Sequence, residues 1–217
     1  IAMLASAAFA AGLDDADLDA RIDALRKSDF EVAVDPAGGE VTYALRRHAF
    51  EFGVALSTAA LGLEASSRHD YSEEDIRRYR EIAAAWFTAA VAENAHKWSA
   101  MEDKHGELRE AAALALYDWC AANALPMRGH AIFWGFGHWM PQWQKDIPAD
   151  ELEARMKRRL RHVLQTFDGK ISEWDLNNEM MHEDLFAQKL GLPHGAAYLA
   201  WAEAADPELR FRVALPR

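Results

Sequence analysis

The feature that most constrains the fold is a repeat in which a short strand-like segment alternates with a helix-like segment. The candidate strands begin near residues 50, 87, 127, 171 and 209, so successive strands start 37, 40, 44 and 38 residues apart. A β-α unit repeated at this length predicts a parallel sheet, because each helix returns the chain to the same end of the sheet. No Gly-x-Gly-x-x-Gly sequence follows the first strand, which disfavours a dinucleotide-binding Rossmann domain. The repeat therefore predicts an α/β fold of the (β/α)8 TIM-barrel type.

Only about five such units fit into the 217 residues, whereas eight would need roughly 250 or more. The sequence therefore predicts a barrel truncated after about five strands: either the chain is a fragment, or the barrel is completed in another way. The expected strands span residues 50–56, 87–92, 127–134, 171–178 and 209–214. The expected helices span 17–27, 107–123, 150–167 and 196–205, and a further helix is expected to begin after its cap Ser72.

Two segments precede the repeat. Residues 1–12 resemble the tail of a secretory signal peptide, with Ala8-Phe9-Ala10 as a cleavage site, which predicts a secreted or periplasmic protein. An apolar N-terminal helix is the alternative interpretation. Residues 13–49 form a lead-in that we expect to hold a helix and two strands, over 30–34 and 41–45. Residues 50–217 make up the predicted partial barrel.

The composition bears on the class of partner. The formal net charge of −11 disfavours a nucleic-acid backbone, whereas a neutral polysaccharide is not repelled. No stretch is long enough for a transmembrane helix, so the sequence predicts no membrane partner. The eight Trp residues serve either as core aromatics or as flat platforms for the apolar faces of sugars. Cys120 is the only cysteine, and we expect it to be buried in a helix.

Polar and aromatic residues gather after three successive candidate strands. The second strand is followed by Glu93-Asn94-Ala95-His96-Lys97-Trp98, the third carries His130 and Trp134, and the fourth leads into Trp174-Asp175-Leu176-Asn177-Asn178-Glu179. Active sites of β/α barrels are built at the carboxyl ends of strands, so these residues are expected to meet. Taken singly, each has a plainer interpretation: a solvated loop glutamate, a core histidine, a packing tryptophan or a surface lysine. Together they predict a carbohydrate site, where hydrogen bonds read hydroxyls and rings stack on sugar faces.

The sequences Glu-Asn-x-x-Lys-Trp, Gly-His-x-x-x-Trp and Trp-Asp-x-x-Asn-Glu, in this order, resemble the strand-end motifs of glycoside hydrolase family 10. The best-known members of that family are endo-1,4-β-xylanases. The resemblance runs from about Phe50 to Val213 and implies the N-terminal portion of a (β/α)8 catalytic domain, with a polysaccharide substrate (xylan or a related β-glycan) and with no cofactor or metal. By this resemblance, Glu179 matches the general acid/base, Glu93, Asn94, Lys97, His130, Trp134 and Asn178 match substrate-binding residues, and Asp175 matches a supporting residue beneath the acid/base.

The resemblance also implies the chemistry, a retaining double displacement in which a second carboxylate attacks the sugar. In the family this nucleophile is a Glu at the end of the seventh strand. The chain stops before a sixth strand, so we place the nucleophile outside it and expect weak or no hydrolysis by residues 1–217 alone. The loop after Trp134 departs from the family, because Gly135 stands where common xylanases have a His and the run to Pro141 is longer. This departure leaves the substrate preference open.

Two other classes of function stay open at this point. The first is a non-catalytic carbohydrate-binding or vestigial barrel fragment that keeps the motifs without a nucleophile. The second is a di-iron oxidase, because Glu93 with His96 and Glu179 with His182 form two Glu-x-x-His pairs. Against the oxidase, both pairs follow strand-like segments and do not lie within long amphipathic helices.

Overall fold

The computed structural model of the protein describes residues 15–29, 31, 33, 42, 44, 49–64, 69–192, 196–207 and 210–213. The chain divides into two compact units, Ile1–Ala44 and Leu45–Arg217. The first unit contains helix α1 (Asp15–Arg26), which lies where the sequence predicts a helix over 17–27. The signal-like segment lies outside the described residues, as does most of the predicted strand pair. Both features, and with them the expected secretion, stay predictions.

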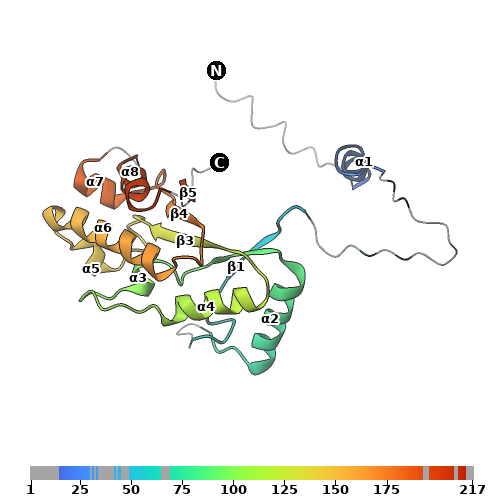
Figure 1. Ribbon diagram of the computed structural model, residues 1–217, viewed down its shortest axis with the longest axis horizontal. Helices are drawn as coiled ribbons and strands as arrows, with labels where there is room; N and C mark the ends of the chain where they lie inside the picture. The colour runs from blue at the N-terminus through green and yellow to red at the C-terminus, as the bar shows by residue number, and fades with distance from the viewer. Residues whose placement is uncertain are drawn as a thin grey trace, which may run out of the picture. The chain divides into compact units, whose positions relative to one another are not determined.

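The second unit is built on one parallel sheet whose five strands follow chain order (Figure 1). This sheet, with helices between its strands, confirms the predicted fold of a partial β/α barrel. The strands are shorter than predicted, because an apolar run does not fix where a backbone ladder begins. Phe50 and Phe52, expected in the first strand, precede the ladder and are exposed. The strands are β1 (Gly53–Leu56), β2 (Ala89–Ala92), β3 (Met127–Phe133), β4 (Glu173–Asn177) and β5 (Arg210–Val213).

Four longer helices connect the strands: α2 (Glu73–Trp86), α4 (Ala111–Ala122), α6 (Ala149–Thr166) and α8 (Ala196–Ala205). Helix α2 begins at the predicted cap, where the Ser72 hydroxyl accepts a hydrogen bond from the Asp75 N–H and the Asp75 carboxylate accepts one from the Ser72 N–H.

The predicted start of α4 at residue 107 is wrong. Leu108 pairs with Glu102 in an isolated antiparallel bridge, so this stretch belongs to the preceding loop. The sequence also missed three short helices: α3 (Trp98–Met101), α5 (Gln142–Lys145) and α7 (Leu185–Leu190). They have four to six residues, too few to show a helical period.

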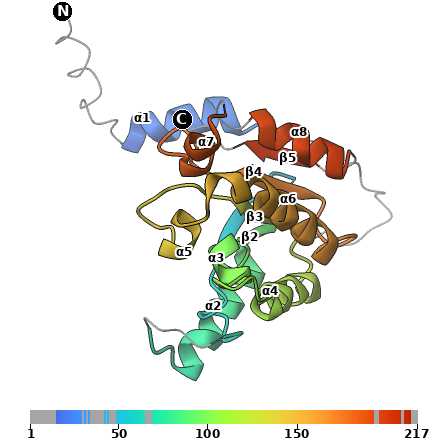
Figure 2. The same ribbon diagram turned by 90° about the vertical axis from the view of Figure 1, so that its left-hand side faces the viewer.

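The hydrophobic core lies between the sheet and the longer helices. Helices α4, α6 and α8 contact β2, β3 and β4 respectively (Figure 2). Trp174 and Leu176 of β4 are fully buried here, against a helical layer that includes Leu160 and Tyr198. Cys120 in α4 is also fully buried, as expected, and burial raises the pKa of its thiol to about 12. A thiol this far from ionisation is a packing group.

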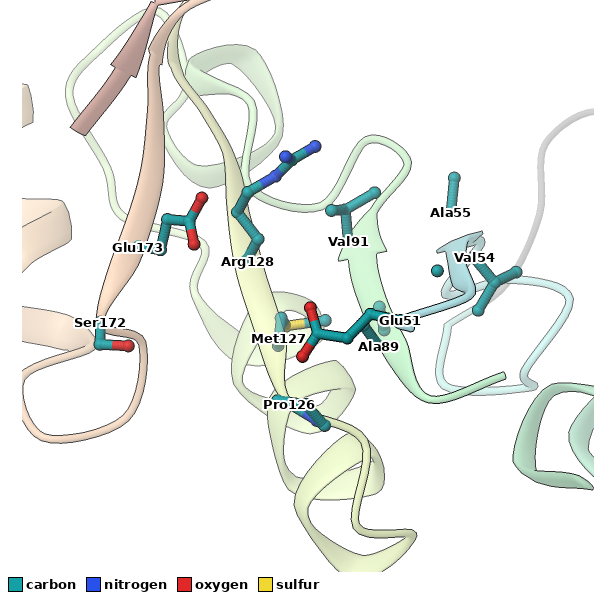
Figure 3. A pocket seen from close by; sticks show the side chains of 12 residues that line it. Glu51, Val54, Ala55, Ala89, Val91, Pro126, Met127, Arg128, Ser172 and Glu173 are labelled. Atoms are coloured by element: carbon teal, nitrogen blue, oxygen red, sulfur yellow. The ribbon is translucent and has the colours of Figure 1, made fainter. Parts of the chain in front are cut away.

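The sheet carries a cavity of about 560 Å³ at the amino ends of its strands. Its lining includes Gly53, Ala89, Met127 and Glu173, the first residues of four strands. Figure 3 shows charged side chains around it, among them Glu173 and Arg128. This end of the sheet is opposite to the one that carries the predicted site. Among the described residues, no helix is both long enough and apolar enough to cross a membrane.

Candidate active site at the carboxyl ends of the strands

The segments that follow β2, β3 and β4 bring three predicted site residues into contact. Trp134, directly after β3, donates from Nε1 to Oε2 of Glu179 at 2.8 Å. The Lys97 ammonium lies 3.9 Å from the centre of the Trp134 ring, a distance typical of a cation–π interaction. One tryptophan therefore joins the predicted acid/base to a predicted sugar-binding lysine.

Lys97 is itself held from two sides. Its ammonium donates to Oδ1 of Asn94 at 2.9 Å, so two of the predicted sugar-binding residues after β2 form one hydrogen-bonded pair. Partial burial lowers the pKa of Lys97, and the negative charges of Glu179 and Glu93 oppose that shift. The charges of both carboxylates therefore favour the protonated form of Lys97.

The backbone of Glu179 adopts an uncommon conformation. Its φ of 56° lies in the left-handed region, which non-glycine residues rarely occupy. Such a conformation costs about 1–3 kcal/mol and persists only where the surroundings fix it. Asn178, the preceding residue, donates its backbone N–H to the carbonyl of Phe133 at 3.0 Å, which ties this turn to the end of β3. The side chain of Asn178 is half-buried.

The two adjacent asparagines after β4 have different surroundings. Asn177 is fully buried and donates from Nδ2 to Oδ2 of Asp184 at 2.8 Å. The other oxygen of Asp184 accepts from the Ala187 N–H at 3.0 Å and from the Tyr198 hydroxyl at 3.3 Å. The buried Asp184 therefore holds the end of β4 by hydrogen bonds that also reach α7 and α8. Sequence reasoning missed it, because it follows a turn and lies in no motif.

A second polar group lies on β3 and β4. His130 faces Asp175 across the two strands, and its Nδ1 lies 2.8 Å from Oδ2 of that carboxylate. The same oxygen is 3.4 Å from Nε of Arg128, two residues earlier on β3. Asp175 therefore contacts His130 and Arg128, and its role as a supporting residue beneath the acid/base stays a prediction. Arg128 was missed, although its position two residues before His130 on a strand puts both on one face.

A cavity of about 830 Å³ opens beside Lys97 and Asn94, and Trp134 forms part of its wall. Ser57 and Thr58, which directly follow β1, also line it. The rule that sites lie at strand ends could have identified both, but their sequence carries no motif. Thr58 donates a short hydrogen bond to Glu64 in the same wall. The described residues that line this cavity are Ser57, Thr58, Ala59, Glu64, His69, Tyr71, Glu93, Asn94, Lys97, Ser99, Ala100, Trp134 and Trp139.

The arrangement does not fit a di-iron site. His96 is fully buried against the rings of Phe167 and Trp174, whereas Glu93 of the same Glu-x-x-His pair is exposed and lines the cavity. Within the part of the chain that the structure describes, no three His, Cys, Asp or Glu side chains cluster as metal ligands. The chemistry available at this end of the sheet is that of a carboxyl group, an ammonium, amides and aromatic rings.

Fold and site together define a β/α-barrel protein whose cleft, at the carboxyl ends of the strands, is lined by carboxylates and aromatic rings. Residues 46–211 match the family model of glycosyl hydrolase family 10, and the chain belongs to that family.

Individual relatives agree with this assignment. The chain is 30% identical over 199 residues to the anti-sigma-I factor RsgI6 of Acetivibrio thermocellus, a match that covers 89% of this chain and 24% of that protein. It is 26% identical over 190 residues to endo-1,4-β-xylanase 3 of Arabidopsis thaliana, covering 88% of this chain and 25% of that protein. The chain thus spans about a quarter of the length of these curated relatives.

Solved structures share the fold. An intracellular xylanase from Thermoanaerobacterium saccharolyticum superposes with a TM-score of 0.60 at 23% identity, over 76% of this chain and 52% of that chain. A family 10 endoxylanase from a sugarcane soil metagenome gives a TM-score of 0.60 at 19% identity, over 75% and 47% of the two chains. The five-stranded sheet therefore corresponds to about half of a family 10 barrel.

Proposed function

We propose that this chain supplies the acid/base and part of the sugar-binding cleft of a retaining hydrolase that cleaves β-1,4-linked xylan-type polysaccharide. The observation that carries the proposal is the contact chain from Lys97 through Trp134 to Glu179 at the carboxyl end of the sheet. A half-buried carboxyl group beside a cleft lined with rings and hydrogen-bonding groups can transfer a proton to a bound sugar.

In the first chemical step, a carboxylate from outside the described residues attacks the anomeric carbon, and the bond from that carbon to the leaving oxygen breaks. Glu179 gives its proton to the leaving oxygen, so the departing chain carries a hydroxyl group and Glu179 becomes a carboxylate. In the second step, Glu179 takes a proton from water while the water oxygen attacks the anomeric carbon and releases the nucleophile. This cycle requires the two carboxyl groups to lie roughly 5–5.5 Å apart.

The neighbouring residues fit supporting roles in this cycle. The indole N–H of Trp134 orients one oxygen of Glu179 and leaves its other oxygen available for the leaving group. Glu93, Asn94 and Lys97 present charged and amide groups to sugar hydroxyls. Asn178 directly follows β4, and His130 lies in the middle of β3. In this cycle Asn178 would hold the hydroxyl next to the anomeric carbon, and His130 would contact the sugar ring.

The test is hydrolysis by the polypeptide that carries this chain, with Glu179→Ala compared with Glu203→Ala, a control at an exposed glutamate of α8. Glu179→Ala should lower the turnover of xylan about 10²–10⁴-fold, the typical contribution of general acid–base catalysis. An aryl β-xylobioside has a phenolate leaving group that departs without a proton, so Glu179→Ala should slow the first step on this substrate much less than on xylan. Equal losses in the rate of the first step on the two substrates would contradict the acid/base role. Strong turnover by residues 1–217 alone, abolished by Glu179→Ala, would place the nucleophile inside the chain.

A second candidate is a carbohydrate-binding module that does not hydrolyse its ligand. It is favoured by the match to a protein named as an anti-sigma-I factor, which is the more similar of the two curated relatives described above. The same cleft would then hold a xylan chain as a signal. Saturable binding of xylo-oligosaccharides by the whole polypeptide, with no release of reducing ends after long incubation, would favour the module over the hydrolase.

A further inference from the structure

The loop between β3 and α5 is fixed tightly against the segment that leads into α7. The Gly135 carbonyl accepts a hydrogen bond from the Leu185 N–H at 2.9 Å, and the Gly137 N–H donates to Oε2 of Glu183 at 2.6 Å. A Cβ atom on Gly135 would lie 2.7 Å from Oδ1 of Asp184, and one on Gly137 would lie 2.7 Å from Cδ1 of Leu185. Both glycines are buried because the loop approaches this segment too closely for a side chain.

The tip of the loop has the opposite character. His138 and Trp139 are exposed between the buried Gly137 and the buried Met140. The rings of His138 and Trp139 contact each other, with their centres 4.6 Å apart and their planes nearly perpendicular. The Trp139 backbone N–H donates to the Phe136 carbonyl at 3.0 Å, which closes the turn beneath it. The backbone of Trp139 is thus held by the turn, while 56% of the residue is exposed.

Trp139 lines the same cavity as the proposed sugar-binding residues Asn94 and Lys97 and the central Trp134. Single exposed aromatic side chains are common on protein surfaces. Trp139 differs from them because its anchored loop places it in the wall of a polar cleft. Tyr71, from the connection between β1 and α2, lines the cavity as well. The cavity of about 830 Å³ therefore has aromatic surface beyond the Trp134 ring that contacts Lys97.

We infer that Trp139 is an additional sugar-stacking residue, which binds a unit of the β-glycan chain next to the one held at Lys97 and Trp134. This inference rests on the proposed function and deepens it, because it gives the site a preference for longer chains. Because the loop that carries Trp139 is already anchored, its backbone loses little conformational freedom on binding, and more of the stacking energy appears as affinity.

The experiment is isothermal titration calorimetry of the whole polypeptide that carries this chain, with xylobiose and with xylopentaose. Trp139→Ala should bind xylopentaose about tenfold more weakly, as for a typical aromatic anchor, and should bind xylobiose as the wild type does. Trp139→Phe should keep most of the affinity, because it keeps a ring. Trp86→Ala is the matched control: Trp86 is 77% exposed at the end of α2 and does not line the cavity. A thermal melt of each variant checks that it is folded.

The outcomes separate this inference from the proposed function. If Lys97→Ala abolishes binding of both sugars while Trp139→Ala binds xylopentaose like the wild type, the stacking role is wrong and the site stands. If Trp139→Ala loses affinity for both sugars equally, the preference for longer chains is wrong. A folded wild-type polypeptide that carries this chain and binds neither sugar would overturn the proposed function, and with it the role of Trp139.

Discussion

At the scale of single residues, His96 lies in a site motif and yet belongs to the core. Its side chain is fully buried between the rings of Phe167 and Trp174, and its Nδ1 accepts the backbone N–H of His130 at 3.3 Å. Burial lowers the pKa of this imidazole to about 3, and the positive charges of Arg159 and His130 act in the same direction. The ring is therefore neutral at pH values well above 3, and its hydrogen bond holds the strand that carries His130.

This burial predicts a pH dependence of stability. An unfolded histidine binds a proton near pH 6.5 and the folded His96 only near pH 3, so the unfolded state binds more protons between these values. The contribution of neutral His96 to the free energy of unfolding is complete above pH 6.5. This contribution to the free energy of unfolding falls as the pH decreases towards 3, by about 1.4 kcal/mol per pH unit midway between the two pKa values. His96→Asn keeps a hydrogen-bond acceptor and removes this titration.

Urea unfolding at pH 7, 6 and 5 measures the effect. The difference in unfolding free energy between the wild type and His96→Asn should shrink as the pH falls. His105→Asn replaces an exposed histidine and is the matched substitution control. Parallel pH curves for wild type and His96→Asn would show that the imidazole is not buried as a neutral group.

The site was predictable from sequence only where its residues follow strands directly. Lys97, Trp134 and Glu179 come just after three parallel strands, and the structure brings them into contact as the strand-end rule requires. Arg128 and Asp184 were not predictable in the same way. Their roles depend on the register of β3 against β4 and on a turn after β4, and neither leaves a periodic signal in the sequence.

At the scale of secondary-structure elements, Gly129 shows that a motif glycine can serve packing. A Cβ atom at this position would lie 2.1–2.4 Å from three ring carbons of Trp174. That ring is fully buried and contacts the rings of His96 and Phe167 at 5.2 and 5.4 Å. The close approach of β3 to the β4 tryptophan therefore depends on the absence of a side chain.

Gly129→Ala should consequently destabilise the protein by about 3 kcal/mol, at the upper end of the cost of overpacking a core. Gly53→Ala is the control on another strand, since its nearest atoms would be 3.8 and 4.0 Å from the new Cβ. It should change stability by no more than about 0.5 kcal/mol. Denaturant midpoints of the two variants give the comparison. A Gly129→Ala protein as stable as Gly53→Ala would mean that Trp174 can move.

The elements themselves were predictable to different degrees. Helix α6 has a strong apolar period, and its bounds differ from the prediction by one residue at each end. Helix α4 begins four residues later than predicted because Leu108 pairs with Glu102, a contact that local sequence does not reveal. Helix α7 has too few residues to show a helical period, although the Asp184 side chain that caps it on the Ala187 N–H is a local signal.

At the scale of the whole molecule, the strands that the structure describes form a sheet with two edges, β1 and β5. Among the described strands, β1 pairs only with β2, and β5 pairs only with β4. Unpaired strand edges are templates for association with another chain. A contact of β1 in one copy with β5 in the next would continue the parallel order of strands. Because such a contact is head-to-tail, the assembly need not close into a ring, and further copies can add to it. We therefore expect assemblies of the isolated chain whose size grows with concentration.

This expectation can be tested at β1, where Ala55 is exposed and lies on the open edge. Ala55→Lys places a charge in the path of an incoming strand, the device by which natural edge strands avoid pairing. In sedimentation velocity over a concentration series, the wild type should show a rising sedimentation coefficient and Ala55→Lys a flatter one. Ala154→Lys adds the same charge on the exposed surface of α6 and should behave as the wild type does. The two lysine variants have equal net charge, so a difference between them can arise only from where the charge lies. A concentration-independent monomer for the wild type would mean that the edges of the sheet are already protected within one copy.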